Sequence, residues 1–125
     1  MTKKYKTQEG QNQSVIIDFL LAQQAQGALL VQRTNNSPTY DSIRHCYRKL
    51  PKGAAKGFPD IYTIIRGYPV HFEVKSDRGV QSPFQKEMQS KIENAGGYYF
   101  IVRNVFEVIQ KVRFFYKQKE LERVC

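Results

Sequence analysis

The amino-acid sequence predicts an α/β fold in which a mixed β-sheet is flanked by helices, in the order helix, strand, strand, strand, helix, strand, helix. Three observations support this fold class. Apolar residues recur at helical spacing near both ends of the chain, the middle of the chain has the pattern of a β-hairpin, and 125 residues are enough for only one core. We therefore expect residues 1–125 to form a single domain.

The first half of the chain predicts a helix, a strand and a long loop. The helix is expected in QSVIIDFLLAQQAQ and ends at Gly27. The apolar residues of its expected inner face are Val15, Ile16, Phe19 and Leu20. ALLVQR then predicts a short strand. Residues 34–58 contain Pro, Gly, Asn and Ser without a clear period, and loops this long are usually functional or mobile.

The second half predicts a helix, a strand and a final helix. The first of these helices ends at AGG, and its expected inner face consists of Phe84, Met88, Ile92 and Ala95. YYFIVR predicts a strand, and the last helix begins with Asn104 and Glu107 at the spacing of a capping box. Its aromatic cluster is typical of a core, with a contact between two copies as the alternative: Phe114, Phe115 and Tyr116.

The charge balance favours a negatively charged partner. Lysine and arginine number 20 against 11 acidic residues, a net charge of +9, which suits nucleic acid or an acidic membrane; a merely soluble basic protein is the alternative. No apolar run is long enough to span a bilayer, and the start of the chain lacks a signal peptide's apolar segment, so we expect an intracellular protein and no membrane partner. Cys46 and Cys125 match no disulfide framework or metal motif.

The long loop and its edges carry most of the candidate nucleic-acid contacts. This part of the sequence has a single acid, Asp41, and two tyrosines, Tyr40 and Tyr47. Its basic residues number six: Arg33, Arg44, Arg48, Lys49, Lys52 and Lys56. Basic side chains displace counterions from a phosphate backbone, and tyrosines stack on exposed bases. The loop is therefore expected to bind nucleic acid, and the alternative is a solvated charged loop.

The hairpin formed by DIYTII and VHFEVK carries charged residues that strands seldom contain. The apolar residues of its second strand alternate with His71, Glu73 and Lys75, so these three point to one side. Asp60 lies at the start of the first strand, where the pairing can bring it near Glu73. Two converging carboxylates suit Mg²⁺ or Mn²⁺, and a lysine beside them can stabilise charge on a phosphate. The alternative is a surface ion pair between Glu73 and Lys75.

The spacing of P-D, one hairpin and E-x-K, with a helix on each side, resembles the PD-(D/E)XK nuclease superfamily. KGFPD at residues 56–60 narrows the resemblance to the VRR-NUC family of virus-type replication and repair nucleases, in its compact phage and bacterial form. GVQSPFQKEMQSKIENAGGYYFIVRNVFEVI is similar to the family's downstream pattern. The resemblance covers about residues 9–110 and implies a restriction-endonuclease-like core.

The resemblance also implies a set of site residues. Asp60 and Glu73 match the metal-binding acids and Lys75 matches the catalytic lysine. It also implies two further metal ligands, Glu9 and the main-chain carbonyl of Val74. Gln85 matches a glutamine at the site.

Two of the polar residues near this site have structural alternatives. Gln85 also fits a capping box with Ser82 that needs no catalytic role. For His71, which the family pattern does not require, we expect a packed or hydrogen-bonded side chain.

The function implied is a metal-dependent, structure-specific DNA endonuclease that acts as a homodimer on four-way (Holliday) junctions, as in DNA repair and recombination. Branched DNA and a second copy are the expected partners, Mg²⁺ or Mn²⁺ is the expected cofactor, and no organic cofactor is expected. The expected location is a bacterial or phage-infected cytoplasm. The alternatives are a non-catalytic nucleic-acid-binding module of the same fold, or a nuclease acting on RNA, flaps or linear DNA.

Overall fold

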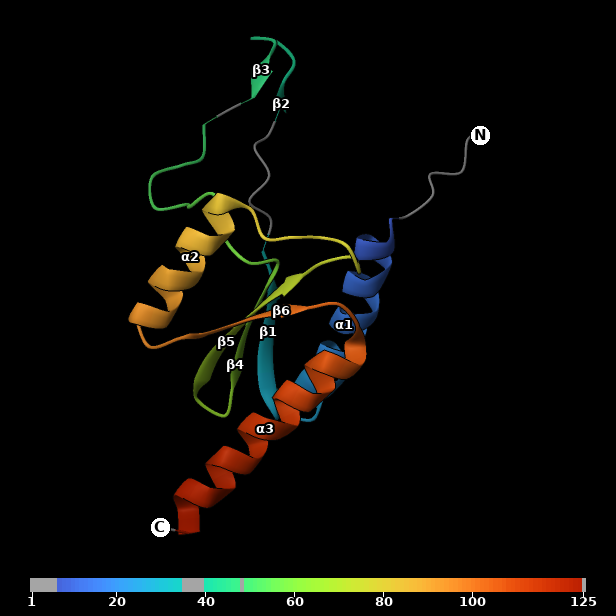
Figure 1. Cartoon of the computed structure of the whole chain (residues 1–125), viewed down its shortest axis with the longest axis vertical. Helices are drawn as coiled ribbons and strands as arrows, with labels where there is room; N and C mark the ends of the chain where they lie inside the picture. Colours follow the sequence, from blue (N-terminus) through green and yellow to red (C-terminus); the bar gives the residue numbers. More distant parts are fainter. Residues whose placement is uncertain (1–6, 35–39, 48, 125) are drawn as a thin grey trace.

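The computed structural model describes residues 7–34, 40–47 and 49–124 (Figure 1). Its helices are α1 (Gln8–Ala25), α2 (Pro83–Asn94) and α3 (Val105–Val124). Its strands are β1 (Leu29–Arg33), β2 (Tyr40–Asp41), β3 (Cys46–Tyr47), β4 (Ile61–Ile65), β5 (Tyr68–Val74) and β6 (Tyr98–Val102). The predicted order of elements is confirmed. The expectation of a loop without regular structure is wrong at one place, because β2 and β3 form a short hairpin within it.

The main sheet has four strands in the order β1-β4-β5-β6. The pairs β1–β4 and β4–β5 are antiparallel, whereas β5–β6 is parallel, so the sheet is mixed as predicted. In the hairpin, Ile61 is paired with Phe72. The residue before Ile61 is therefore beside the residue after Phe72, which brings Asp60 to Glu73.

Helices cover both faces of this sheet (Figure 1). On one face, α1 and α3 pack against the apolar residues of β5, around a core that includes Ile16, Phe72 and Phe115. On the other face, α2 packs through Met88 and Ile92 against Tyr99 of β6. The result is a three-layer arrangement in which β5 is buried on both sides.

The expected inner face of α1 is partly correct. Ile16 and Leu20 are fully buried, and Phe19 packs at the edge of the core. Val15 was expected in the core but is 52% exposed. A helix turns about 100° per residue, so only a stripe centred on Ile16 and Leu20 reaches the sheet. Thr7 caps the helix by accepting a hydrogen bond of 3.0 Å from the N–H of Gly10.

In α2, the expected inner face is correct at its centre and wrong at its ends. Met88 and Ile92 are buried, whereas Phe84 is half exposed and Ala95 is the exposed C-cap residue. The residues that pack against the sheet thus lie in the middle of α2, and Phe84 and Ala95 lie at its two ends. Phe84 instead contacts the Lys56 ammonium, which lies 4.6 Å from the centre of its ring.

The start of α3 differs in detail from a capping box. Asn104 accepts a hydrogen bond of 3.0 Å from the N–H of Glu107, as predicted, but Glu107 accepts one of 3.2 Å from the N–H of Arg103. The aromatic cluster of α3 is divided. Phe115 is buried in the core, the Tyr116 hydroxyl hydrogen-bonds Gln23 Oε1 at 3.0 Å, and Phe114 is half exposed.

Two smaller expectations concern membranes and cysteines. None of the helices within the described residues is long and apolar enough to cross a membrane. Cys46 is an exposed free thiol in β3. Cys125 lies outside the described residues.

Candidate active site

Asp60 lies at the entry to β4 and is fixed by the two neighbouring strands. Its Oδ2 accepts a hydrogen bond of 2.9 Å from the N–H of Val74, the last residue of β5. Its main-chain carbonyl accepts another of 2.9 Å from the N–H of Thr34, the residue after β1. The carboxylate is therefore held at one end of the sheet, next to the end of β5.

Glu73 is an acid in the protein interior, only 2% exposed. Its Oε1 accepts a hydrogen bond of 2.7 Å from Gln85 Nε2 and lies 3.8 Å from Lys75 Nζ. Its Oε2 is buried and has no hydrogen-bond partner among the described residues. A buried polar atom without a partner is costly, so this oxygen favours a further donor or a cation.

The electrostatics of Glu73 point the same way. Burial first and the negative charge of Asp60 second raise the pKa of Glu73 to about 8, a rise that Lys75 opposes. Two carboxyl groups in a site of low dielectric cannot both stay charged without compensation. At neutral pH, Glu73 therefore keeps its proton unless a cation compensates its charge.

Lys75 follows β5 directly, and its N–H donates a hydrogen bond of 3.0 Å to the carbonyl of Val102 in β6. Its side chain and that of Glu73 are only 13% and 3% exposed. A surface ion pair therefore does not describe them. Gly79 lies against the stem of Lys75, since a Cβ at Gly79 would be 3.3 Å from Lys75 Cδ.

Gln85 forms the predicted helix cap and also contacts Glu73, while its role in catalysis stays a prediction. Its N–H donates to Ser82 Oγ at 3.2 Å and its Oε1 accepts from the N–H of Ser82 at 2.8 Å, which is a reciprocal capping box at the start of α2. Its Nε2 remains free of the cap and donates to Glu73. The two interpretations are compatible because the cap uses the amide oxygen and the site uses the amide nitrogen.

This architecture is shared with a solved structure. A chain described as "VRR_NUC domain" aligns with a TM-score of 0.61 at 21% sequence identity, over 86% of this chain and 97% of that chain. The chain has the VRR_NUC fold. No protein-family model matches the sequence, and no curated protein matches it. The fold and the motif spacing agree, since the β4–β5 hairpin places the two acids and the lysine at one end of the sheet.

Within the VRR_NUC fold, Glu9 lies in the first turn of α1. The neighbouring Gln8 donates from Nε2 to Asp77 Oδ2 at 3.1 Å, and the N–H of Asp77 donates to Gln8 Oε1 at 3.4 Å. These contacts tie the start of α1 to the segment after Lys75. The role of Glu9 as a ligand stays a prediction, as does that of the Val74 carbonyl.

The donors of the site fit a hard divalent cation. Within residues 7–34, 40–47 and 49–124, no three His, Cys, Asp or Glu side chains are arranged to hold a metal ion. Asp60 and Glu73 therefore form a two-carboxylate site with one buried oxygen unused. Mg²⁺ is commonly bound by one or two carboxylates together with water and substrate phosphates. The pair is suited to a cation that arrives with its substrate.

His71 is packed and hydrogen-bonded, as expected. Its Nδ1 lies 3.3 Å from the carbonyl oxygen of Tyr98, and its ring contacts those of Phe58 and Tyr62, with centres 5.4 and 5.0 Å apart. Burial lowers the pKa of His71. A neutral imidazole held in this way supports the α2 face of the sheet.

Two residues near the site were missed by the sequence reasoning. Tyr99 pairs with His71 in the β5–β6 register and is buried, with no well-formed hydrogen bond from its hydroxyl to the described residues. The pKa of Tyr99 is raised to about 12, first by burial and then by the negative charge of Glu73, whereas the nearby amide of Gln81 opposes the rise. The alternation of YYFIVR indicates this face, but only the parallel pairing with β5 puts Tyr99 near the acids.

Arg103 is the second missed residue. Its Nη1 donates to the main-chain carbonyls of Ser76 and of Gly79, the latter at 3.0 Å. Its own carbonyl accepts a hydrogen bond of 2.8 Å from Asn12 Nδ2 in α1. Arg103 therefore holds the segment that follows Lys75. No periodicity or spacing signals such a role.

The predicted basic residues lie on the segment that connects β1 to β4, and Arg33 is the last residue of β1. Arg48 lies outside the described residues, and the others are exposed: Arg33, Arg44, Lys49, Lys52 and Lys56. The returning part of the segment is fixed on α2, because Gly57, with φ of +80°, lies so close that a Cβ would be 2.7 Å from the Phe84 carbonyl carbon. Lys56 is thereby held over the ring of Phe84, the residue that precedes Gln85.

Proposed function

We propose that this protein is a metal-dependent endonuclease that hydrolyses phosphodiester bonds in DNA. The observation that carries the proposal is the buried acid Glu73 beside the half-buried Asp60, with one oxygen of Glu73 that makes no well-formed hydrogen bond and with Lys75 and Gln85 next to it. Burying a carboxyl group whose oxygen lacks a partner costs stability. Such carboxylates are useful where they bind a cation that also contacts a phosphate.

Asp60 and Glu73 would hold Mg²⁺ or Mn²⁺, with the Val74 carbonyl and Glu9 as the additional ligands that the family resemblance implies. When bound, the cation supplies charge neutralisation at the phosphate and lowers the pKa of a water molecule. Gln85 orients the carboxylate, because its hydrogen bond to Oε1 leaves Oε2 as the atom available to the cation.

Lys75 contributes a positive charge next to the acid pair. Its ammonium lies 3.8 Å from Glu73 Oε1, and its side chain keeps 13% of its surface exposed, so it can reach a phosphate oxygen bound at the site. A fixed positive charge in a site of low dielectric stabilises the charge that develops on the phosphate in the transition state. Its stem is confined by Gly79, which limits the positions of the ammonium.

Branched DNA and a homodimeric state belong to the same proposal. They are supported by the resemblance to compact VRR-NUC nucleases and by the net charge of +9. Two sites in one dimer would serve the two strands that resolution of a four-way junction cuts. Light scattering tests the dimer, since a monomer has a mass of 14.6 kDa and a dimer twice that value.

The test of the activity is cleavage of labelled four-way junction, flap, linear duplex and matching RNA, each with Mg²⁺, Mn²⁺ or EDTA. We expect metal-dependent incision of the junction that is lost in Asp60→Asn and in Lys75→Met. Asp18→Asn and Lys91→Met change the same residue types on exposed helix surfaces and should cleave like the wild type.

Three outcomes would contradict the proposal. Cleavage retained by Asp60→Asn would exclude the acid pair as the site. Tight, salt-sensitive binding without any cleavage by the wild type would favour a nucleic-acid-binding module. Cleavage confined to RNA would make the protein a ribonuclease.

A further inference from the structure

The β2–β3 hairpin stands clear of the sheet and its helices, at the end of the molecule where β1 leads into it (Figure 1). The segment that carries it leaves the sheet after β1 and returns at β4. Its two ends meet at the site, because the N–H of Thr34 donates to the carbonyl of Asp60 at 2.9 Å and the Thr34 hydroxyl hydrogen-bonds the carbonyl of Pro59. The hairpin therefore projects from the same end of the sheet as the acid pair.

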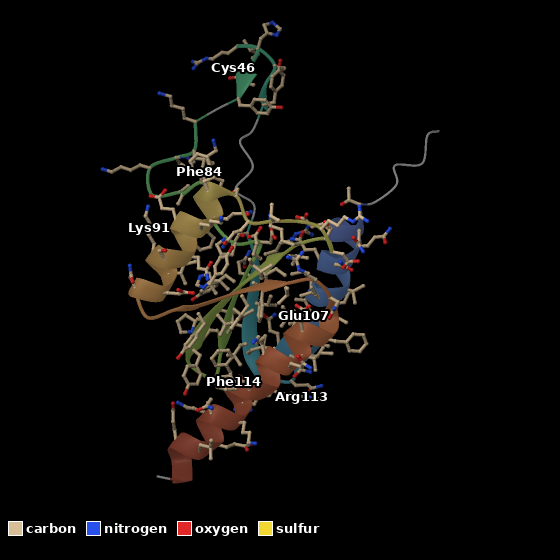
Figure 2. The ribbon with its side chains drawn as sticks, viewed as in Figure 1. Cys46, Phe84, Lys91, Glu107, Arg113 and Phe114 are labelled. Atoms are coloured by element: carbon tan, nitrogen blue, oxygen red, sulfur yellow. The ribbon has the colours of Figure 1, made fainter. Side chains whose placement is uncertain are left out.

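The returning part of this segment is also packed beside the site. Lys56 lies over the ring of Phe84, and Phe58 packs against the cluster formed by Met88, Ile92 and Tyr99. Figure 2 shows Phe84 at the end of α2 that is nearer to Cys46 in the hairpin. A substrate that is bound at Asp60 and Gln85 and extends past this end of the sheet would thus meet the hairpin, which projects from the same end.

The hairpin has a defined local structure. Asp41 Oδ1 accepts hydrogen bonds from the N–H groups of Ile43 at 3.0 Å and Arg44 at 3.2 Å, which fixes the turn. The rings of Tyr40 and Tyr47, which are paired across the two strands, meet edge to face with centres 5.3 Å apart. These contacts hold a hairpin of only two residue pairs, which would otherwise be marginal.

The turn presents apolar surface to solvent. Ile43 is 89% exposed, the highest value for any large hydrophobic side chain in the described residues, and Tyr47 and Tyr40 are 68% and 53% exposed. The hydrogen bonds to Asp41 fix the backbone of the turn at Ile43, and the Ile43 side chain adds nothing to the core. Exposed apolar side chains gathered on a projecting element mark a binding surface.

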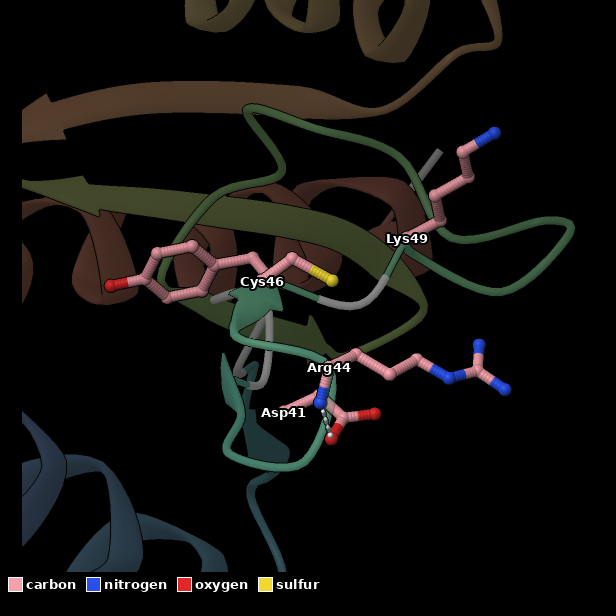
Figure 3. A pocket seen from close by; sticks show the side chains of 5 residues that line it. Asp41, Arg44, Cys46 and Lys49 are labelled. Atoms are coloured by element: carbon pink, nitrogen blue, oxygen red, sulfur yellow. Dashed lines mark hydrogen bonds between the residues drawn. The ribbon is translucent and has the colours of Figure 1, made fainter.

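The charges beside this surface identify its partner as an anion. Arg44 and Lys49 extend to the same side, with the Cys46 thiol between them, and line an open pocket of about 570 Å³ together with Asp41 and Tyr47 (Figure 3). Two cations on a hairpin that also presents exposed tyrosine rings are groups that bind phosphates and bases.

We propose that the β2–β3 hairpin recognises the branch of a DNA substrate by inserting Ile43 between unstacked bases, with Tyr40 and Tyr47 against the base faces and Arg44 and Lys49 on the adjacent phosphates. The inference rests on the proposed nuclease function for its substrate and adds the element that selects the substrate's shape. In a regular duplex an apolar tip must first unstack the bases at a cost in free energy, whereas at a branch it inserts where stacking is already weakened. Basic residues alone would bind duplex and branch alike.

The experiment is a binding measurement on the full chain in EDTA, so that no cleavage occurs. Its substrates are a four-way junction with 2-aminopurine at the branch and a linear duplex with 2-aminopurine at its centre. We expect the wild type to bind the junction more tightly and to raise its fluorescence through unstacking. Ile43→Ser should reduce the junction preference about tenfold and remove the fluorescence change, since one stacking contact is worth that much.

Three further variants complete the test. Tyr40→Leu/Tyr47→Leu keeps apolar bulk and should also reduce the preference. Arg44→Gln/Lys49→Gln should weaken binding to both DNAs and lower the salt dependence by about one to two phosphates. Leu121→Ser, at an equally replaceable exposed site on the far end of α3, should behave like the wild type. Thermal melting confirms that each variant is folded.

Unchanged junction preference and fluorescence in folded Ile43→Ser would overturn the proposal, as would a wild type that binds the two DNAs equally. These readouts are independent of cleavage. A wild type that cleaves nothing with Mg²⁺ or Mn²⁺ therefore defeats the proposed nuclease, while the hairpin is still judged by binding.

Discussion

Along β5, Val70, Phe72 and Val74 face α1 and α3, whereas His71 and Glu73 face α2. Both sets are buried: the three apolar residues are fully covered, and His71 and Glu73 are almost so. On the first face, burial removes apolar surface from water and stabilises the fold. On the second face, burial leaves Glu73 with a raised pKa and an oxygen without a partner. One strand thus contributes stability on one side and a destabilising buried acid on the other.

The largest expected effect on stability is at the apolar face. Phe72→Ala should lower the free energy of unfolding by about 3–5 kcal/mol, because it removes contacts to a fully buried ring and leaves a cavity. Urea denaturation measures this change. Phe106→Ala, at an exposed position on α3, is the matched control and should stay within about 0.5 kcal/mol of the wild type. Equal losses in the two variants would remove the distinction between core and surface.

The opposite result is expected on the other face. Glu73→Gln should lower cleavage more than about 100-fold, since changes at mere supporting partners of metal ligands already cost about 10–100-fold. The variant should be as stable as the wild type or more so at neutral pH, because a neutral amide keeps the contact with Gln85 and needs no compensating charge. Initial rates and thermal melts test the two parts. Activity near that of the wild type would show that Glu73 is only buried, and not functional.

The stability of the cation-free protein should depend on pH through Glu73. Its pKa rises from 4.5 to about 8 on folding, chiefly through burial, so the folded state binds this proton more tightly than the unfolded state. Stability from this group is then fully present below about pH 4.5 and is lost as the pH rises toward 8. The melting temperature of the wild type in EDTA should fall over this range relative to Glu73→Gln, in which other groups titrate equally.

Addition of Mn²⁺ at pH 8 should restore the melting temperature of the wild type and leave that of Glu73→Gln nearly unchanged, because a ligand that binds the folded state stabilises it. Parallel pH profiles for the two proteins would show that Glu73 does not carry the pH dependence.

The smallest expected effect separates the two roles of Gln85. Ser82→Ala removes the cap alone and should cost about 1 kcal/mol of stability with little change in cleavage. Gln85→Ala removes the cap and the hydrogen bond to Glu73, so it should cost similar stability and also lower cleavage by about 10–100-fold. The comparison of the two variants in melts and rates gives the result. Equal cleavage in both would leave Gln85 as a cap only.

Much of the site could be predicted from the sequence. The alternation of VHFEVK fixes that His71, Glu73 and Lys75 share a side, and the short hairpin fixes that Asp60 meets Glu73, because strand pairing repeats every two residues. The capping pattern of SPFQ likewise set the start of α2. These features depend on residues that are close in sequence.

What covers each element was decided by the tertiary structure. The alternation in β5 does not indicate that α2 lies over Glu73, and this packing turns a pattern typical of a surface ion pair into a buried acid with a raised pKa. The exposure of Val15, Phe84 and Phe114 and the outward position of Ile43 have the same origin. Local periodicity specifies which residues share a face, whereas burial and electrostatics depend on the distant segment that packs against that face.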